Sequence, residues 1–398
     1  MSSTATATGQ GTQAAEGRGG SAHGRSDLVI VGAGIVGLSH AYEAVRRGMS
    51  VTVVERDHEP VGASVRNFGH CCITAQHGEL LGLARRSREG WLRAAESSGL
   101  WAEEAGAYVV ARTATEMAVL EELAAERGAD AVQLRSAART AEVLGREDGG
   151  AGLVGGAFLR DDLRVDPREA AGRLAEWLSR QPNARVLWGT SVNGVESGTV
   201  HTPRGPVHGE QILVCVGHDL DRLFPEAAEE HGVLRCRLSM ARVRAPEGLR
   251  TNAAVLSNTS MLRYDGFTAQ PSAARLREET GAHSPGLVEI GANVMCTRLP
   301  DGTLLTGDSH HYGRTAPPFL DERVSERLLD ALAEMLGVRG FEVLERWQGV
   351  YASSAQGPLL VRDFAPGVRA LSVTSGIGMT LSFGLAAASL EGVLGATA

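Results

Sequence analysis

Lysine is absent from the chain, so all 39 residues counted as Lys or Arg are arginine. Without lysine the protein cannot form the Schiff base by which ordinary pyridoxal-phosphate enzymes hold their cofactor. It also cannot complete a Walker A phosphate loop, which requires a lysine. Both classes of enzyme are therefore excluded.

Cysteine is scarce, and no CxxC pair occurs. The five cysteines are Cys71, Cys72, Cys215, Cys236 and Cys296. An odd count in a long chain argues against a disulfide framework and against a structural zinc site. We expect reduced thiols, a cytoplasmic location and no bound metal ion.

Long hydrophobic runs are also missing, because no apolar segment approaches the roughly 18 residues of a membrane span. The formal net charge is −8, which gives no general attraction to nucleic acid. We therefore expect neither a membrane span nor a nucleic-acid partner. Residues 1–26 are rich in Ser, Thr, Ala and Gly and lack a signal-peptide core, which predicts a disordered tail. An organellar transit peptide is the weaker alternative for this segment.

A glycine motif lies between the first predicted strand and the first predicted helix. Residues 28–31 (LVIV) are typical of a strand buried on both faces, and residues 51–54 (VTVV) form the next strand. Between them, GxGxxG is completed by Gly32, Gly34 and Gly37. These glycines allow a tight turn, close approach to a pyrophosphate and close packing of helix on strand. Glu55 ends the second strand, at about the spacing of an acid that binds a ribose hydroxyl. The unit predicts a dinucleotide site at a helix N-terminus.

Three further segments carry a family resemblance. They are GASVRNFG (62–69), a mid-chain strand ending in VCVG (214–217), and SGIGMT (375–380) near the C-terminus. In this order, after the glycine motif, they resemble the D-amino-acid oxidase superfamily of flavoproteins, which includes glycine oxidase, sarcosine oxidase and D-amino-acid dehydrogenase. The resemblance extends over residues 27–398. GASVRNFG, LARRSREGWL and GDSHHYG (307–313) are similar to a subgroup associated with phosphonate breakdown.

The resemblance implies an α/β protein with a Rossmann-type FAD-binding domain and an α+β substrate domain built on an antiparallel sheet. The elements typical of cofactor binding lie at the start, middle and end of the chain, so both domains are expected to be discontinuous. We expect the FAD-binding domain in residues 27–105, 157–232 and 340–398. The substrate domain is expected in residues 106–156 and 233–339.

The resemblance also implies which residues hold a non-covalent FAD. The residues expected at its ADP half are Gly32, Gly34, Ile35, Val36, Gly37, Glu55 and Arg56. Those expected beside the pyrophosphate, the adenine and the flavin are Ser64, Arg66, Asn67, Val192, Cys215, Val216 and Gly217. The last helix would begin at the flavin C2 carbonyl, through Gly376, Ile377, Gly378, Met379 and Thr380. A helix N-terminus there stabilises the negative charge of a reduced flavin.

The sequence departs from its relatives near residues 346–353. Tyr351 stands where amino-acid oxidases usually place an arginine for the substrate carboxylate, which argues against a simple α-amino-acid clamp. The cysteine that sarcosine oxidases attach to FAD is replaced by Gly349 or Val350. Their oxygen-activating lysine is missing too, so either an arginine or histidine supplies that charge or oxygen is not the main acceptor.

Five side chains are candidates for the substrate site: Arg66, His70, His310, His311 and Tyr351. His310 and His311 are adjacent on a predicted strand, so their side chains point to opposite faces and one of them at most faces the site. Each candidate also has a structural alternative, such as a salt bridge for Arg66 or core packing for Tyr351.

The sequence thus predicts an FAD-dependent oxidoreductase that oxidises the C–N bond of a small amine. The resemblance implies an aminoalkylphosphonate, 2-aminoethylphosphonate or its N-methyl form, converted to an imine and then to an aldehyde plus ammonia or methylamine. Oxygen or another acceptor would take the electrons. The alternative is a glycine, sarcosine or D-amino-acid oxidase or dehydrogenase, which a carboxylate-binding arginine in the pocket would favour. A flavin-binding protein without turnover is a third interpretation.

Overall fold

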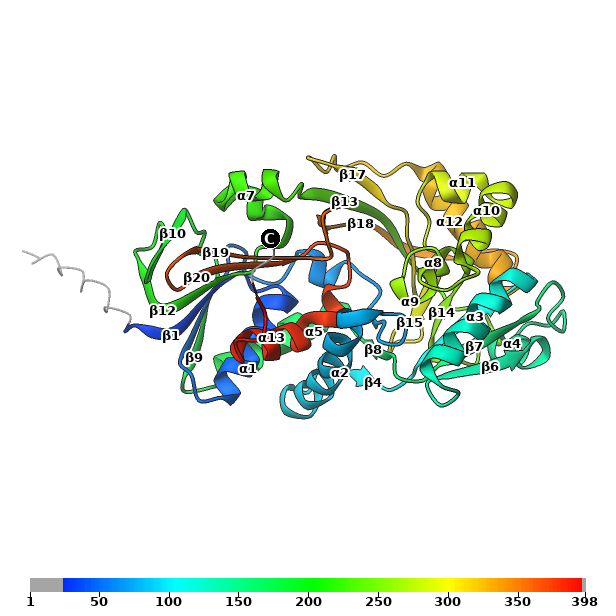
Figure 1. The fold of residues 1–398 in the computed structure, drawn as a ribbon, viewed down its shortest axis with the longest axis horizontal. Helices are drawn as coiled ribbons and strands as arrows, with labels where there is room; N and C mark the ends of the chain where they lie inside the picture. The colour runs from blue at the N-terminus through cyan, green and yellow to red at the C-terminus, as the bar shows by residue number, and fades with distance from the viewer. Residues whose placement is uncertain (1–23, 396–398) are drawn as a thin grey trace, which may run out of the picture.

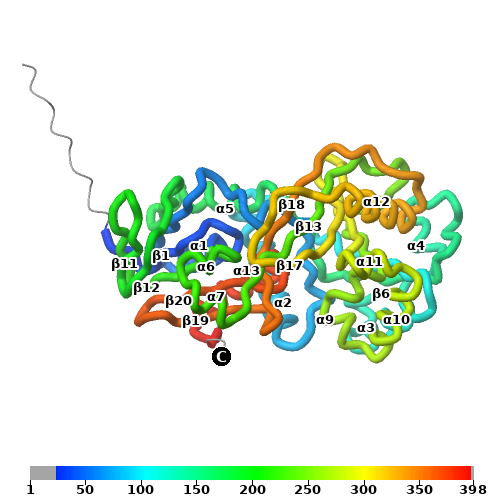
Figure 2. Tube along the Cα trace, turned by 90° about the horizontal axis from the view of Figure 1, so that it is seen from above, coloured from blue at the N-terminus to red at the C-terminus, as the bar shows by residue number. Residues whose placement is uncertain are grey.

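The computed structural model describes residues 24–395. Two large sheets lie side by side along the long axis of the molecule, as the two views in Figures 1 and 2 show. Most of the tail predicted for residues 1–26 lies outside the described residues. The prediction fails at its end, because Ser26 already belongs to strand β1 (Ser26–Val31), where it pairs with β12.

The first sheet is a parallel sheet centred on β1. Its strands run in the order β9–β2–β1–β12–β20, all parallel, and β19 pairs antiparallel with β20 at one edge. Their bounds are β2 (Val51–Val54), β9 (Ala184–Leu187), β12 (Val207–Val214), β19 (Leu359–Ala365) and β20 (Val368–Val373). The apolar runs in β1 and β2 are buried, as expected of strands covered on both faces.

Helices cover one face of this sheet and a mixed layer covers the other. The helical layer contains α1 (Ile35–Arg46), α2 (Gly78–Ser98), α5 (Pro167–Ser179) and α13 (Gly378–Leu390). The opposite face is covered by α6 (Leu220–Leu223), by α7 (Pro225–Glu230) and by the hairpin of β10 (Gly194–Glu196) and β11 (Thr199–His201). This hairpin extends the sheet, because β11 pairs antiparallel with the start of β12. Trp91 of α2 donates from Nε1 to the Met379 carbonyl at 2.8 Å, which fixes the first turn of α13.

The second sheet has nine strands and its own apolar clusters. Its order is β17–β13–β16–β15–β14–β5–β7–β6, and β18 pairs with β13. The bounds are β5 (Ala107–Ala111), β6 (Val132–Ser136), β7 (Gly155–Leu159), β13 (Leu234–Val243), β14 (Ala254–Leu256), β15 (Met295–Arg298), β16 (Leu304–Gly307), β17 (His311–Gly313) and β18 (Val343–Ser353). All pairs are antiparallel except β14 with β5, so this expected antiparallel sheet contains one parallel pair.

Seven helices accompany this sheet. They are α3 (Ala114–Arg127), α4 (Ala137–Leu144), α8 (Asn258–Met261), α9 (Asp265–Thr268), α10 (Ala273–His283), α11 (Pro285–Glu289) and α12 (Glu322–Leu336). Within residues 24–395, no helix combines the length and the apolar composition needed to cross a bilayer.

The expected domain boundaries stay a prediction, and two strands do not follow them. They would assign part of β7 and all of β18 to the FAD-binding domain, yet both strands lie in the nine-stranded sheet. β18 stays there because it pairs with β13 along the whole length of that strand. A small sheet of β3 (His70–Cys71), β8 (Leu163–Val165) and β4 (Ala102–Glu103) completes the fold.

Candidate active site

A cavity of about 650 Å³ runs from the carboxyl ends of β1, β2 and β12 to the second sheet. It is lined by the glycine turn, the segment around η1 (Ala63–Val65) and η2 (Gly217–Asp219), the middle of β18 and the start of α13. In open α/β sheets, ligands bind outside the carboxyl ends of the strands. The cavity is therefore the candidate active site.

The glycine turn has room for glycine alone at two positions. Gly32 has φ +105°, and an added Cβ would lie 2.5 Å from the Cys215 carbonyl oxygen. At Gly37 a Cβ would lie 2.2 Å from the Gly32 carbonyl oxygen. Gly32 and Gly34 line the cavity, whereas Gly37 packs α1 against the turn and does not reach it. The backbone can thus approach a ligand closely at the start of α1.

Glu55 and Ser64 accept hydrogen bonds from this turn. Glu55 Oε2 accepts from the Ala33 N–H at 2.7 Å, and Ser64 Oγ accepts from the Ile35 N–H at 2.8 Å. The N-cap residue of α1 is Gly34, which has no side chain to cap the helix, and the first turn holds no acidic residue. The positive end of α1 therefore faces the cavity without an acidic side chain from its own first turn. This arrangement suits an anionic diphosphate.

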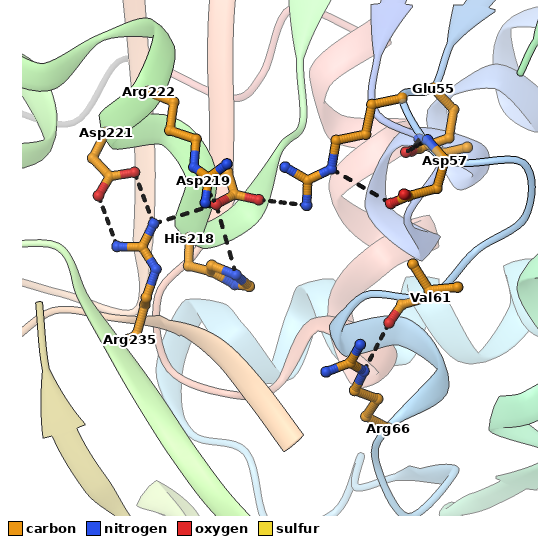
Figure 3. A network of polar contacts seen from close by, with 11 residues as sticks. Glu55, Asp57, Val61, Arg66, His218, Asp219, Asp221, Arg222 and Arg235 are labelled. Atoms are coloured by element: carbon orange, nitrogen blue, oxygen red, sulfur yellow. Dashed lines mark hydrogen bonds and ion pairs between the residues drawn. The ribbon is translucent and has the colours of Figure 1, made fainter. Parts of the chain in front are cut away.

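The segment at residues 62–69 is shaped by its own side chains. Asn67 donates from Nδ2 to the carbonyls of Ala63 and Ser64, and its Oδ1 accepts from the Gly69 N–H at 2.8 Å. Arg66 donates from Nε to the Val61 carbonyl at 2.7 Å and lines the cavity. Asn67 therefore holds the loop in shape, while Arg66, which Figure 3 shows bonded to Val61, brings a cation to the cavity wall.

An ion-pair network bridges the ends of β2 and β12 beside the cavity (Figure 3). Asp219 of η2 pairs with Arg56 at 2.7 Å, Arg222 at 3.1 Å and Arg235 at 3.2 Å. Burial opposes ionisation of Asp219, but His218 and the arginines outweigh it, so the pKa of this carboxyl is lowered. The carboxylate stays charged and ties Arg56 to the opposite strand end.

The start of α13 forms another wall. Gly376 has φ +77°, and a Cβ there would lie 2.8 Å from Tyr351 Cζ, so the tyrosine ring packs directly on this turn. Helix α13 has no acidic residue in its first turn and no side-chain cap. Thr380, expected at the flavin, instead is buried and accepts the Cys72 N–H at 3.1 Å, because its side chain faces β3. The other expected residues of this turn line the cavity.

The end of the cavity at the second sheet carries a polar cluster. Its members are Arg263, Tyr264, Asn293, Asp308, His310 and Tyr351. His310 Nδ1 donates to the Gly291 carbonyl at 2.8 Å, and its Nε2 lies 3.8 Å from Asp308 Oδ2. Arg263 has no ion pair within 4.0 Å among residues 24–395. Burial lowers the pKa of Arg263, but Tyr351 and Asp308 outweigh this effect and keep it charged.

Of the five predicted substrate-site residues, Arg66, His310 and Tyr351 line the cavity and two do not. His311 is exposed, on the face opposite His310. His70 is buried and bonds through Nε2 to Asp162 Oδ2 at 2.9 Å, so that carboxylate takes it out of the site. With Cys72 these two offer three possible metal-ligand atoms within 4.8 Å of one another. Burial raises the pKa of the Cys72 thiol well above its usual value, which makes it a poor ligand.

Sequence reasoning missed Arg263, Tyr264, Asn293 and Asp308 as site residues. Asp308 stands inside GDSHHYG, so that motif was the one available signal for it. Arg263 comes from the short connection between α8 and α9 and belongs to no recognisable motif. Val192, Arg56, Cys215 and Gly217, which the sequence places at the cofactor, line the cavity.

The fold and the cavity are those of a dinucleotide-binding protein, and a family match makes the class specific. Residues 27–390 match the DAO family, FAD dependent oxidoreductase, so the chain belongs to this family and FAD is its cofactor. A search of the curated proteins finds no match.

Solved structures with the same fold include three oxidoreductases. Glycine oxidase from Geobacillus kaustophilus has a TM-score of 0.70 at 21% identity, over 92% of this chain and 94% of that chain. L-proline dehydrogenase from P. horikoshii has a TM-score of 0.74 at 17% identity, over 92% and 94%. Dithionite-reduced L-α-glycerophosphate oxidase from Mycoplasma pneumoniae, with FAD bound, has a TM-score of 0.72 at 18% identity, over 94% and 96%.

The cavity fits FAD on its own geometry. At one end the glycine turn and the N-terminus of α1 offer N–H groups to a diphosphate, and Glu55 lies beside them for a ribose. The N-terminus of α13 meets the other end, where a flavin carbonyl would lie. Two helix ends without acidic first turns thus face one cavity, where they would meet the central diphosphate of FAD and the ring that becomes anionic when the flavin is reduced.

Proposed function

We propose that the protein uses FAD to oxidise the C–N bond of a small amine that also carries an anionic group. The observation that carries this proposal is Arg263, a cavity-lining guanidinium without a carboxylate partner among the described residues. A charged guanidinium at a cavity wall is a strong and directional anchor for a carboxylate or phosphonate.

When bound, FAD would supply the acceptor for a hydride, that is one proton with two electrons, from the carbon that bears the substrate nitrogen. The protein holds that carbon at the cofactor and keeps water away. Arg263 would bind the anionic group, and the Tyr351 ring, packed on Gly376 at the start of α13, would close the cavity beside the reacting centre. The imine product then hydrolyses to an aldehyde or keto acid plus ammonia or methylamine.

An aminoalkylphosphonate, such as 2-aminoethylphosphonate or its N-methyl form, is the first candidate. The segments GASVRNFG and GDSHHYG support it, and GDSHHYG contributes Asp308 and His310 to the cavity. The tetrahedral oxygens of a phosphonate suit several separate donors, and Arg263, Tyr351 and Arg66 lie along the cavity wall.

A glycine-, sarcosine- or D-amino-acid-type substrate is the second candidate, and Arg263 favours it as well. Tyr351 argues against a clamp at the usual position, but Arg263 enters the cavity from another segment and would supply the carboxylate-binding arginine that this candidate needs. Glycine oxidase and L-proline dehydrogenase, two proteins with this fold, act on amino acids by name.

Several properties of the cofactor and location belong to the same proposal. Cys215 lines the cavity, but burial raises the pKa of its thiol far above the usual value, which supports non-covalent FAD. The five cysteines are unpaired, in keeping with a cytoplasmic location. Oxygen or another acceptor would regenerate the cofactor.

The test is an anaerobic screen for loss of the oxidised flavin absorbance. The compounds are 2-aminoethylphosphonate, its N-methyl form, glycine, sarcosine and D-alanine, with ethylphosphonate as the control that lacks an amine. Bleaching by one or more amines and not by ethylphosphonate is expected, and reoxidation by air is then timed against a quinone or dye. A flavin that no anionic amine bleaches would refute the proposed function.

A further inference from the structure

Asp308 is a buried carboxyl at the substrate end of the cavity that lacks a full set of partners. It follows β16, is 4% exposed and lines the cavity. Its Oδ1 has no hydrogen-bond partner among residues 24–395. A buried carboxylate without partners is costly, so such a group stays neutral or meets a cationic ligand.

The two charged ends of the polar cluster differ in sign. Arg263 presents a cation and Asp308 an ionisable carboxyl, and both line the same cavity without forming an ion pair within 4.0 Å. His310 stands next to Asp308, with Nε2 at 3.8 Å from Oδ2. Burial lowers the pKa of His310 well below its usual value, so the ring is neutral. Its proton lies on Nδ1, which donates to the Gly291 carbonyl, so Nε2 presents no competing cation to the carboxyl.

We propose that Asp308 accepts the proton of the substrate ammonium group while Arg263 holds the anionic end of the same molecule. This assignment rests on the proposed function. One N–H bond of the ammonium breaks and an O–H bond forms on Asp308, while the electron pair stays on nitrogen. The resulting neutral amine can lose hydride from its carbon to FAD, which an ammonium cannot do, and the carboxyl proton returns to solvent after the product leaves.

The surroundings of Asp308 make its ionisation distinguishable from that of its neighbours. Burial raises the pKa of Asp308 to about 7, against the opposing effect of Arg263 and Asn293. The other ionisable groups that face it are Arg263, Tyr264, His310, Tyr351 and Cys236. Burial lowers the pKa of the histidine and raises those of the two tyrosines and the thiol. Near neutral pH, Asp308 is thus the member of this cluster that titrates.

The first experiment measures binding without turnover. Propionate has an anionic group but no amine, and its charge is constant from about pH 6 to about pH 9. Its Kd, read from the flavin spectrum of the holoenzyme, should rise roughly 10- to 100-fold over that range, because ionised Asp308 repels the anion. Asp308→Asn should remove this pH dependence, while the exposed control Asp330→Asn should keep it.

The second experiment follows turnover with whichever amine bleaches the flavin. In the wild type, kcat/KM should fall below about pH 7 as Asp308 becomes protonated. In Asp308→Asn it should fall about 10²- to 10⁴-fold, and its acidic limb should move toward the pKa of the free amine. If kcat/KM falls equally at all pH values and its decrease at low pH is not shifted, Asp308 has a merely structural role and the assignment is overturned.

The outcomes separate the two proposals. A wild-type Kd for propionate that does not change with pH overturns the role of Asp308, even if Asp308→Asn does not fold. Persistence of the pH dependence in a folded Asp308→Asn holoenzyme overturns it as well. Failure of the proposed function has another signature: no amine reduces the flavin, although propionate affinity still depends on pH.

Discussion

Replacing Arg263 by methionine tests the anion anchor directly. Methionine keeps an unbranched side chain at this position while the charge is lost. A hydrogen bond to a charged group contributes about 1.5–3 kcal/mol, and each 1.4 kcal/mol is a factor of ten in affinity. We therefore expect the KM for an anionic amine and the Kd for propionate to rise roughly 10- to 150-fold.

The same substitution should shift the titration of the neighbouring groups. Arg263 lowers the pKa of Asp308 and that of His310. Its removal should therefore move the pH midpoint of propionate binding above the wild-type value of about 7. The measurement is a series of flavin-spectrum titrations at several pH values.

An exposed arginine supplies the control. Arg323 on α12 has a side chain that is 87% exposed and pairs with Asp321, so Arg323→Met should leave both KM and Kd unchanged. If Arg263→Met retains its FAD and binds propionate as tightly as the wild type, Arg263 does not bind the anionic group of the ligand. The substrate argument built on it would then fail.

Three further substitutions test the fold around the cofactor. Gly37→Ala places a Cβ 2.2 Å from the Gly32 carbonyl oxygen, so the purified protein should carry less FAD, read as a lower ratio of visible to ultraviolet absorbance. Gly384→Ala places a Cβ 2.0 Å from the Leu83 carbonyl oxygen at the contact of α13 with α2, and this overpacking should cost about 1–3 kcal/mol in urea unfolding. Burial lowers the pKa of His40 in the folded protein to about 4, below its value of about 6.5 in the unfolded chain. The stability that the neutral histidine contributes is therefore complete above about pH 6.5 and is lost as the pH falls below that value. Between about pH 7.5 and about pH 4.5 the free energy of unfolding should therefore decrease less in His40→Gln than in the wild type, by about 2–3 kcal/mol. An equal decrease in both proteins would show that His40 is not the cause.

The cofactor end of the site was largely predictable because its information is local. Strand, glycine turn, helix and strand follow one another within residues 26–54, and hydrogen bonds between neighbouring elements fix their arrangement. The acid at Glu55 then reaches the turn, where it accepts the Ala33 N–H. The C-terminal turn was recognisable by its sequence, yet the direction of Thr380 was not, because its partner Cys72 is distant in the chain.

The histidines show that residue type alone does not predict which side chains line the cavity. A histidine in a motif segment is equally compatible with a cavity and with the core, and the choice depends on a partner elsewhere. For His70 that partner is Asp162, in the loop before β8, which no local pattern connects to it. For His310 and His311 the strand alternation predicted opposite faces, and the contact with Gly291 shows which of them turns inward.

The substrate end depends on segments that only the tertiary fold brings together. Arg263 lies between two helices of four residues each, Asp308 follows β16, and Tyr351 lies on β18, so no spacing rule connects them. Tyr351 at the position of an expected arginine argues against a simple α-amino-acid clamp. The cavity nevertheless holds a cation, because charge is a property of the assembled pocket and any segment that reaches it can supply one. When a motif residue is missing, only the usual hydrogen-bond donor at that position is excluded. Another segment that lines the pocket can supply the same charge, so the chemistry of the site does not follow from that position alone.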